Sequence, residues 1–315
     1  MSASRVPPAG VRTVACVGAG VIGGGWVAYF LAHGFDVIAW DPAPDAERSL
    51  RHVVDSAWPA LVELGLADGA SRDRLVVATD LSAAVADTDF VQESAPEQLG
   101  LKVDLLADID AVTAPHVVIA SSTSGFGMSE MQVRCAHPGR TVVAHPFNPP
   151  YLIPLVEVVG GVQTDPEAVA WTSDFFRHAG KSVITMDREV PGFVANRLQE
   201  ALWREALHMV AAGEATVEQI DLSITDGPGL RWPVQGPCLT FHLAGGQGGM
   251  GHMLDHFGPS LQSPWTRLVS TELTRDLRDE MVAGCEREAA GRSIDELVAE
   301  RDRGVIAVLR ALGRA

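Results

Sequence analysis

The stretch from Val14 to Asp41 constrains the fold more than any other part of the chain. It begins with the apolar run Val14 to Val17, whose length is typical of a buried parallel strand. The turn Gly18-Ala19-Gly20-Val21-Ile22-Gly23 follows directly and forms a G-x-G-x-x-G pattern. Apolar residues at helical spacing come next, and Phe35 to Trp40 has the composition of a second strand. We therefore predict a strand, a helix that starts at the glycines, and a second strand.

Each glycine of the turn has a separate expected role in binding a dinucleotide. Gly18 permits the tight turn, Gly20 lets the backbone approach a pyrophosphate, and Gly23 lets the helix pack closely on the strand. The N-terminus of the following helix offers unpaired N–H groups and a partial positive charge to the phosphates. The predicted cofactor-binding residues of this turn are Gly18, Ala19, Gly20, Val21, Ile22 and Gly23.

Asp41, at the end of the second predicted strand, indicates which dinucleotide is bound. Its carboxylate can accept hydrogen bonds from both hydroxyls of an adenosine ribose, whereas a 2′-phosphate would meet a like charge. We therefore predict NAD rather than NADP. A secretory or membrane segment is the alternative for such an apolar stretch. The six glycines from Val14 to Gly34 inclusive and the nearby Asp36 and Asp41 disfavour it.

Composition limits the remaining possibilities. The chain has 315 residues, of which 47% are hydrophobic and 20% charged, which is typical of a globular protein with two domains. Its net charge of −16 argues against nucleic acids and anionic membranes as partners. The four cysteines are widely spaced, so we expect free thiols, no metal site and a cytoplasmic location.

Further strands and helices alternate up to about residue 190. Strands are predicted at 75–78, from residue 90, at 117–120, at 141–145 and around Glu157, and a pair of helices is predicted between residues 42 and 74. This alternation predicts an α/β domain with a parallel sheet covered on both faces, and ligands of such sheets bind beyond the carboxyl ends of the strands.

The pattern changes near residue 190, after which only helices are predicted. One begins at Pro191-Gly192, and two later ones have the capping boxes Thr216–Gln219 and Ser293–Glu296. We therefore predict two domains, residues 1–190 for NAD binding and residues 191–315 for substrate binding and dimerisation. The apolar helices of the second domain exceed what one subunit can cover, which predicts a homodimer.

His145 is the candidate base for removing the proton of a hydroxyl group. It ends a predicted strand, and a proline-rich loop leads from it into the strand that carries Glu157. This path can bring the Glu157 carboxylate to one imidazole nitrogen while the other nitrogen faces the substrate. Asn196 and Ser124 are candidates for hydrogen bonding to the reacting oxygen.

These residues lie in stretches that resemble the 3-hydroxyacyl-CoA dehydrogenase family. The stretches are His145-Pro-Phe-Asn148-Pro, Leu155-Val-Glu157-Val, Pro191-Gly-Phe-Val-Ala-Asn196-Arg and Ser-Ser-Thr-Ser124. The resemblance extends over nearly the whole chain. It implies a Rossmann-like, doubly wound parallel sheet followed by an all-helical dimerisation domain.

The same resemblance implies roles for individual residues. Ser124, His145, Glu157 and Asn196 take the catalytic positions, with Asn148 beside them. Glu97 and Lys102 match residues that contact the nicotinamide ribose region. Ser122 occupies a cofactor-binding position that is usually Asn in the acyl-CoA enzymes.

The stretches Gly227-Pro-Gly-Leu-Arg-Trp232, His242-Leu-Ala-Gly-Gly and Pro264-Trp-Thr resemble those family members that oxidise the 3-hydroxyl of L-carnitine more than they resemble the acyl-CoA enzymes. Coenzyme A carries several phosphates, which basic residues normally bind. Residues 42–74, where family members meet the CoA end, hold six acids against four arginines. The alternatives are a 3-hydroxybutyryl-CoA dehydrogenase, an L-gulonate 3-dehydrogenase and a lambda-crystallin-like structural protein that binds NAD.

A trimethylammonium substrate has no N–H to donate, so aromatic faces must recognise it, at about 0.5–2 kcal/mol per contact. Phe147 and Phe257 are the first aromatic candidates. Small residues can leave room for a compact substrate, and those predicted to line its cavity are Gly192, Val194, Ala195 and Gly227.

Overall fold

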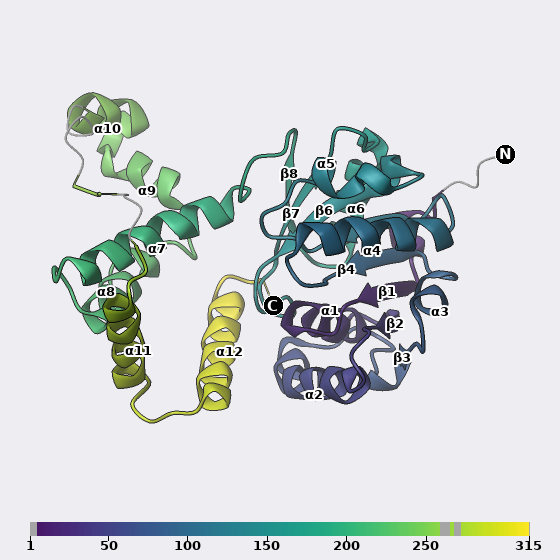
Figure 1. Ribbon diagram of the computed structural model, residues 1–315. Helices are drawn as coiled ribbons and strands as arrows, with labels where there is room; N and C mark the ends of the chain where they lie inside the picture. The colour runs from purple at the N-terminus through teal and green to yellow at the C-terminus, as the bar shows by residue number, and fades with distance from the viewer. Residues whose placement is uncertain (1–4, 259–264, 268–271, 315) are drawn as a thin grey trace. The chain divides into compact units, whose positions relative to one another are not determined.

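The computed structural model describes residues 5–258, 265–267 and 272–314 and divides into two compact units (Figure 1). The first comprises Met1–Asn196 and the second Arg197–Ala315. The sequence places the domain boundary at about residue 190. We describe each unit by itself.

The first unit is built on a sheet that contains eight strands within the described residues. These are β1 (Thr13–Val17), β2 (Asp36–Trp40), β3 (Leu75–Val77), β4 (Phe90–Glu93), β5 (Val118–Ser121), β6 (Thr141–Pro146), β7 (Leu155–Gly160) and β8 (Ser182–Met186). Their order is β3-β2-β1-β4-β5-β6-β7-β8. The pairs from β3 to β6 are parallel, β6 and β7 are antiparallel, and β7 and β8 are parallel. The predicted α/β class is confirmed.

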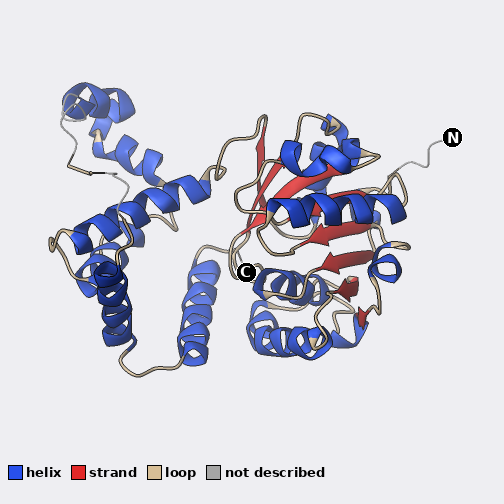
Figure 2. Cartoon of the chain, in the orientation of Figure 1, coloured by secondary structure: helices blue, strands red, loops and turns tan. Residues whose placement is uncertain are grey.

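Helices cover both faces of this sheet, as Figure 2 shows. They are α1 (Val21–Ala32), α2 (Ala46–Leu64), α3 (Leu81–Val85), α4 (Leu99–Val112), α5 (Met128–Met131) and α6 (Pro166–His178). Alternate residues of β1 enter two separate cores: Val14 and Cys16 pack with α1, α2 and α6, while Ala15 and Val17 pack with α3, α4 and α5. The strand is buried on both sides, which explains why its sequence is a continuous apolar run.

Three local predictions differ from the structure. Residues 42–74 form one long helix, α2, and a short 3-10 helix (Arg72–Arg74) rather than a helical pair, because Gly65 ends α2 with a φ of 108°. The sequence does not indicate the edge strand β8, because its mostly exposed residues give it no clear apolar pattern. Helix α7 (Ala195–Ala211) begins after the turn at Pro191-Gly192 and not at it.

The second unit is helical throughout its described residues. After α7 come α8 (Val217–Thr225), α9 (Pro237–Ala244), α10 (Gly249–Phe257), α11 (Arg275–Ala289) and α12 (Ile294–Ala311). The capping boxes predicted at Thr216–Gln219 and Ser293–Glu296 are confirmed at the starts of α8 and α12.

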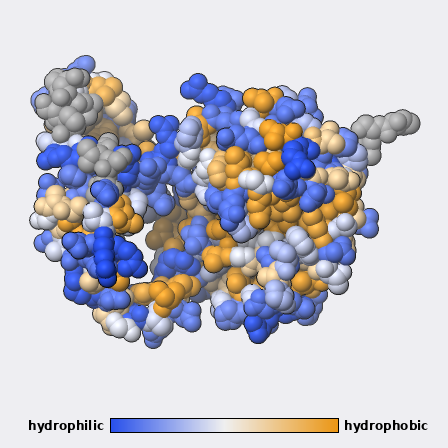
Figure 3. All heavy atoms as spheres, viewed as in Figure 1, coloured by the Kyte–Doolittle hydropathy of each residue, from blue (hydrophilic) through white to orange (hydrophobic). Residues whose placement is uncertain are grey.

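Many large apolar side chains of the second unit are exposed in the single chain. Examples are Leu198, Leu202, Trp203, Phe241 and Leu254. Figure 3 shows hydrophobic residues at the surface among the hydrophilic ones. None of the helices in the described residues combines the length and apolar character needed to cross a bilayer.

Candidate active site

Many of the predicted site residues of the first unit lie at or beyond the carboxyl ends of four adjacent strands. The glycine turn follows β1, Ser94 to Glu97 follow β4, Ser122 to Ser124 follow β5, and His145 lies near the end of β6. Because these strands are neighbours in the order β1-β4-β5-β6, the turn and the histidine stand at opposite ends of one row. Ligands of open α/β sheets bind along such an edge.

The glycine turn has the geometry that a dinucleotide requires. Gly18 has a φ of 104°, and a Cβ atom there would lie 2.6 Å from the carbonyl oxygen of Ser94. A Cβ atom on Gly23 would collide with the carbonyl of Gly18, whereas one on Gly20 would meet nothing within 4 Å. The first and third glycines are therefore required for packing, and the second leaves space for a ligand at the start of α1. Of the two intervening residues, Val21 is exposed and Ile22 packs against the core.

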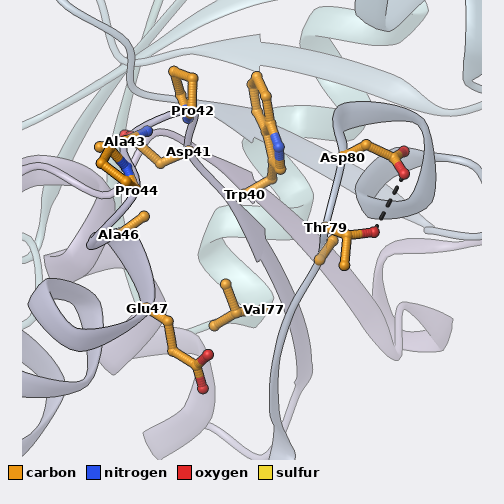
Figure 4. Close-up of a pocket in the computed structure, with 11 residues that line it drawn as sticks. Trp40, Asp41, Pro42, Ala43, Pro44, Ala46, Glu47, Val77, Thr79 and Asp80 are labelled. Carbon is orange, nitrogen blue, oxygen red and sulfur yellow. Dashed lines mark hydrogen bonds between the residues drawn. The ribbon is translucent and has the colours of Figure 1, made fainter.

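Asp41 connects the glycine turn to the loop after β2. Its Oδ2 accepts a hydrogen bond from Ala19 N at 2.8 Å, and its Oδ1 accepts one from Ala43 N at 2.9 Å. A cavity of about 510 Å³ opens beside it, lined by the ends of β2 and β3 and the start of α2. Figure 4 shows Trp40, Asp41 and Glu47 around this cavity. Its position and size fit the adenosine half of a dinucleotide, and its acids disfavour a 2′-phosphate.

His145 and Glu157 form a hydrogen-bonded pair across the antiparallel strands β6 and β7. The two residues are direct partners in the strand register. His145 Nδ1 lies 3.0 Å from Glu157 Oε2, and both side chains are buried. The strand–loop–strand path thus brings these residues together.

The other oxygen of Glu157 binds the start of α7. Its Oε1 accepts hydrogen bonds from Val194 N and Ala195 N, each at 3.0 Å. The backbone reaches this position through two consecutive left-handed residues, Gly192 (φ 67°) and Phe193 (φ 54°). A bulky residue with positive φ is strained, so the surrounding packing must hold Phe193 in place.

Burial raises the pKa of Glu157, but the hydrogen bonds from His145, Ala195 and Val194 lower it more, so the net pKa lies below its ordinary value. The carboxylate is therefore charged at neutral pH and accepts a hydrogen bond from His145 Nδ1. In the neutral imidazole this arrangement leaves Nε2 as the nitrogen that can accept a proton.

Asn196 lies between the β5 loop and the imidazole. Its Nδ2 donates to the carbonyl oxygen of Ser124 at 3.0 Å and lies 3.5 Å from His145 Nε2. An amide donor at Nε2 agrees with the tautomer that Glu157 favours. The structure thus brings all four residues predicted as catalytic into one cluster.

Glu97 and Lys102 lie behind this loop. Glu97 Oε1 accepts hydrogen bonds from Thr123 Oγ1 (2.7 Å), Ser124 N (3.0 Å) and Gly125 N (3.1 Å). Lys102 is buried, and its Nζ donates to Glu93 Oε1 at 2.9 Å and lies 3.6 Å from Glu97 Oε2. Glu97 therefore shapes the loop that carries Ser124, and Lys102 supports Glu97 from inside the fold.

Ser122 is hydrogen-bonded to three polar side chains. Its Oγ accepts from Trp26 Nε1 at 3.1 Å and from Gln92 Nε2 at 2.8 Å, and it lies 2.9 Å from Ser94 Oγ. The predicted cofactor residue is thus part of a polar cluster.

The predicted substrate residues are divided between the two units. Phe147 is half-buried, with its ring centroid 4.8 Å from that of His145. Asn148 is exposed in the loop after β6. Gly227 precedes a 3-10 helix in the second unit, and Phe257 ends α10, where its ring contacts His256.

Two residues that sequence reasoning missed shape the site. Phe193 is buried, and its ring centroid lies 5.3 Å from that of His145. Lys181 Nζ donates to the carbonyls of Pro150 and Ile153, which fixes the loop after His145. Phe193 stands inside the recognised Pro-Gly-Phe stretch, which is the one signal that points to it.

The geometry agrees with a comparison with known families. Residues 13–190 match the model of the 3-hydroxyacyl-CoA dehydrogenase NAD binding domain, and residues 192–281 match that of the C-terminal domain of the same enzymes. The chain belongs to the 3-hydroxyacyl-CoA dehydrogenase family. This membership confirms the predicted dehydrogenase class and NAD as the cofactor. Among the described residues, no group of three His, Cys, Asp or Glu side chains is placed to hold a metal ion.

Individual proteins of this family are similar over nearly the full length. An L-carnitine dehydrogenase of Streptomyces coelicolor is 72% identical over 98% of this chain and 96% of its own. An L-carnitine dehydrogenase of Nocardiopsis dassonvillei is 71% identical over 98% of this chain and 94% of its own. Among solved structures, 5-formyl-3-hydroxy-2-methylpyridine 4-carboxylic acid 5-dehydrogenase, an NAD+ dependent dismutase, is 29% identical with a TM-score of 0.82, covering 96% of this chain and 99% of that one.

Proposed function

We propose that this protein oxidises the 3-hydroxyl group of L-carnitine to a ketone, giving 3-dehydrocarnitine, with NAD as the hydride acceptor. The observation that carries the proposal is the His145–Glu157 pair, which supplies the base, in a chain more than 70% identical to L-carnitine dehydrogenases. Within the first unit, the proposed substrate site also includes Ser124, Asn196, Phe147, Gly192, Val194 and Ala195. Gly227 and Phe257 of the second unit stay predicted substrate residues.

The chain's own residues supply the proton chemistry of this reaction. When bound, NAD accepts the hydride from the carbinol carbon. His145 Nε2 takes the proton of the hydroxyl group. The Nδ1–H group stays hydrogen-bonded to the Glu157 carboxylate, whose charge stabilises the imidazolium that forms. The Asn196 amide, 3.5 Å from Nε2, holds the reacting oxygen beside the base. In the reverse direction the same imidazolium is the acid.

The surface around α2 supports a small substrate rather than coenzyme A. Every arginine between residues 42 and 74 is already paired with a carboxylate. The pairs are Arg48–Asp45 (2.9 Å), Arg51–Glu47 (2.8 Å), Arg72–Asp55 (2.5 Å) and Arg74–Asp36 (3.1 Å). The phosphates of coenzyme A would have to compete with these acids for each guanidinium.

Phe147 supports a cationic substrate. Its ring meets the imidazole at an interplanar angle of 66°, so the ring lies beside the proposed reacting atoms. A trimethylammonium group against such a face gains about 0.5–2 kcal/mol without any hydrogen bond.

Steady-state rates with NAD on L-carnitine, 3-hydroxybutyryl-CoA and L-gulonate test the proposal. We expect L-carnitine to have the highest kcat/KM. If kcat/KM is higher on 3-hydroxybutyryl-CoA or on L-gulonate, that compound and not L-carnitine is the substrate. The absence of turnover on all three would favour the crystallin-like structural role instead.

We also propose that the protein functions as a homodimer in the cytoplasm through its second unit, because so many apolar side chains of α7 to α10 are exposed in the single chain. Light scattering at micromolar concentration should give twice the mass of the 33.5 kDa chain. A monomeric mass would contradict the dimer.

A further inference from the structure

The hydroxyl group of Ser122 is the centre of a polar cluster drawn from three elements. Trp26 comes from α1, Gln92 from β4, and Ser94 from the residues just after β4. Their polar atoms lie 3.1, 2.8 and 2.9 Å from Ser122 Oγ. The mechanism described above uses none of these contacts.

With Trp26 Nε1 and Gln92 Nε2 as donors to Ser122, the hydrogen-bonding capacity of Ser122 fixes the direction of its bond with Ser94. A serine hydroxyl has one hydrogen to donate and two lone pairs, and an indole N–H can only donate. Trp26 Nε1 and Gln92 Nε2 therefore occupy both lone pairs of Ser122. Its own hydrogen is left for Ser94 Oγ at 2.9 Å. Ser94 then accepts from Ser122 and keeps its own hydrogen for another acceptor.

Ser94 stands where the nicotinamide half of the cofactor must pass. A Cβ atom on Gly18 would lie 2.6 Å from the Ser94 carbonyl oxygen, and one on Gly23 would lie 3.4 Å from Ser94 Cβ, so Ser94 packs against the glycine turn. A dinucleotide that extends from this turn on β1 to His145 on β6 must cross the ends of β4 and β5. Ser94 and Ser122 occupy those two ends.

We propose that Ser94, and not Ser122, contacts the cofactor, by donating its hydroxyl hydrogen to the carboxamide oxygen of the nicotinamide ring. Ser122 is a positioning residue: its lone pairs are filled by Trp26 and Gln92, and it orients the Ser94 hydroxyl. This inference rests on NAD as the cofactor and is independent of the identity of the substrate.

Equilibrium binding of three oxidised dinucleotides tests this proposal without any turnover. They are NAD, thionicotinamide adenine dinucleotide, whose sulfur accepts hydrogen bonds weakly, and 3-acetylpyridine adenine dinucleotide, which keeps the carbonyl but lacks the amide N–H. Binding is measured by the quenching of tryptophan fluorescence. The proteins are the wild type, Ser94→Ala, Ser122→Ala and, as a matched control, Ser223→Ala on the exposed face of α8.

We expect Ser94→Ala to lower the affinity for NAD and for the acetylpyridine analogue about tenfold, which corresponds to the loss of one hydrogen bond. The affinity for the thionicotinamide analogue should fall clearly less. Ser122→Ala should weaken the binding of NAD and of the acetylpyridine analogue more than that of the thionicotinamide analogue, but by less than Ser94→Ala, because it disorients the Ser94 hydroxyl. It should also lower the unfolding midpoint, because it leaves two donors unpaired. Ser223→Ala should match the wild type. If Ser94→Ala does not fold, Ser94→Gly removes the same hydroxyl.

Three results would overturn the proposal. The first is unchanged NAD affinity in a folded Ser94 variant. The second is loss of the preference for NAD over the thionicotinamide analogue in Ser122→Ala but not in Ser94→Ala. The third is a Ser94→Ala effect that disappears with the acetylpyridine analogue, since Ser94 would then accept from the amide and not donate to the carbonyl.

Discussion

Glu157 lies directly opposite His145 in the antiparallel register of β6 and β7, and its carboxylate binds two different parts of the site. Oε2 lies 3.0 Å from the imidazole Nδ1, while Oε1 accepts the N–H groups of Val194 and Ala195 at the start of α7. One buried carboxylate therefore orients the proposed base and fixes the segment that carries Asn196.

Glu157→Gln should lower kcat strongly while leaving NAD binding intact. The amide keeps the size of the side chain and one acceptor, but it has no charge to stabilise the imidazolium. We expect kcat to fall by about 10²–10⁴-fold, the range typical of general-base catalysis. Steady-state kinetics, with NAD affinity measured separately, provide the readout.

Glu130→Gln, at an exposed position of α5, is the matched control and should keep the wild-type rate. A Glu157→Gln protein with wild-type kcat and wild-type folding would show that the pair does not serve in the chemical step.

The same carboxylate should make the fold sensitive to acid. Its folded pKa lies below the ordinary value of 4.5, so its ionised form stabilises the folded protein fully above that value. This stabilisation is lost as the pH falls through the lowered pKa. The urea midpoint should therefore drop between about pH 5 and pH 3, and it should drop less in Glu157→Gln. If the urea midpoints of the wild type and of Glu157→Gln change with pH in the same way, the acid sensitivity comes from other carboxyl groups.

Asp41→Asn should reduce the preference for NAD over NADP. The substitution removes the charge that repels a 2′-phosphate, and we expect NADP to gain at least about tenfold in relative kcat/KM. NAD affinity should also fall somewhat, because an amide cannot accept the hydrogen bonds from both Ala19 N and Ala43 N equally well. Glu47→Gln, which lines the same cavity, should change the ratio much less. If Asp41→Asn leaves the ratio of kcat/KM with NADP to kcat/KM with NAD unchanged, Asp41 does not determine the cofactor preference.

The parts of the site that could be predicted from the sequence are those that follow from local patterns. The glycine turn and Asp41 lie within one strand–helix–strand unit, so spacing alone gives their roles. His145 and Glu157 could be paired because a short loop joins their strands. Phe193 could not be assigned in the same way, since nothing in its immediate sequence indicates a left-handed aromatic residue packed on the imidazole.

Most of the site contacts that could not be predicted from the sequence join side chains that are distant along the chain. Ser94 meets Ser122 only because β4 and β5 pair in parallel, which sets their ends side by side. Lys181 reaches the carbonyls of Pro150 and Ile153 from the position just before β8, a strand that the sequence does not indicate. Such contacts depend on tertiary packing and leave no periodic signal.

Lys102→Met should destabilise the first unit and also loosen the site. Lys102 and Glu93 are both buried, and the Lys102 ammonium lies 2.9 and 3.2 Å from the two oxygens of Glu93. Removing the lysine leaves an uncompensated buried carboxylate, for which a loss of about 3–5 kcal/mol is expected. Glu97 also loses the ammonium 3.6 Å from its Oε2, so the loop that carries Ser124 should be held less firmly.

The double variant Glu93→Gln/Lys102→Met separates these two effects. It removes the unpaired charge, so most of the lost stability should return, whereas Glu97 still lacks its partner. We therefore expect urea unfolding close to that of the wild type together with a raised KM for NAD. If KM recovers along with stability, Lys102 acts only through Glu93. If stability does not recover, the buried Lys102–Glu93 pair stabilises the fold by more than the mutual neutralisation of its two charges.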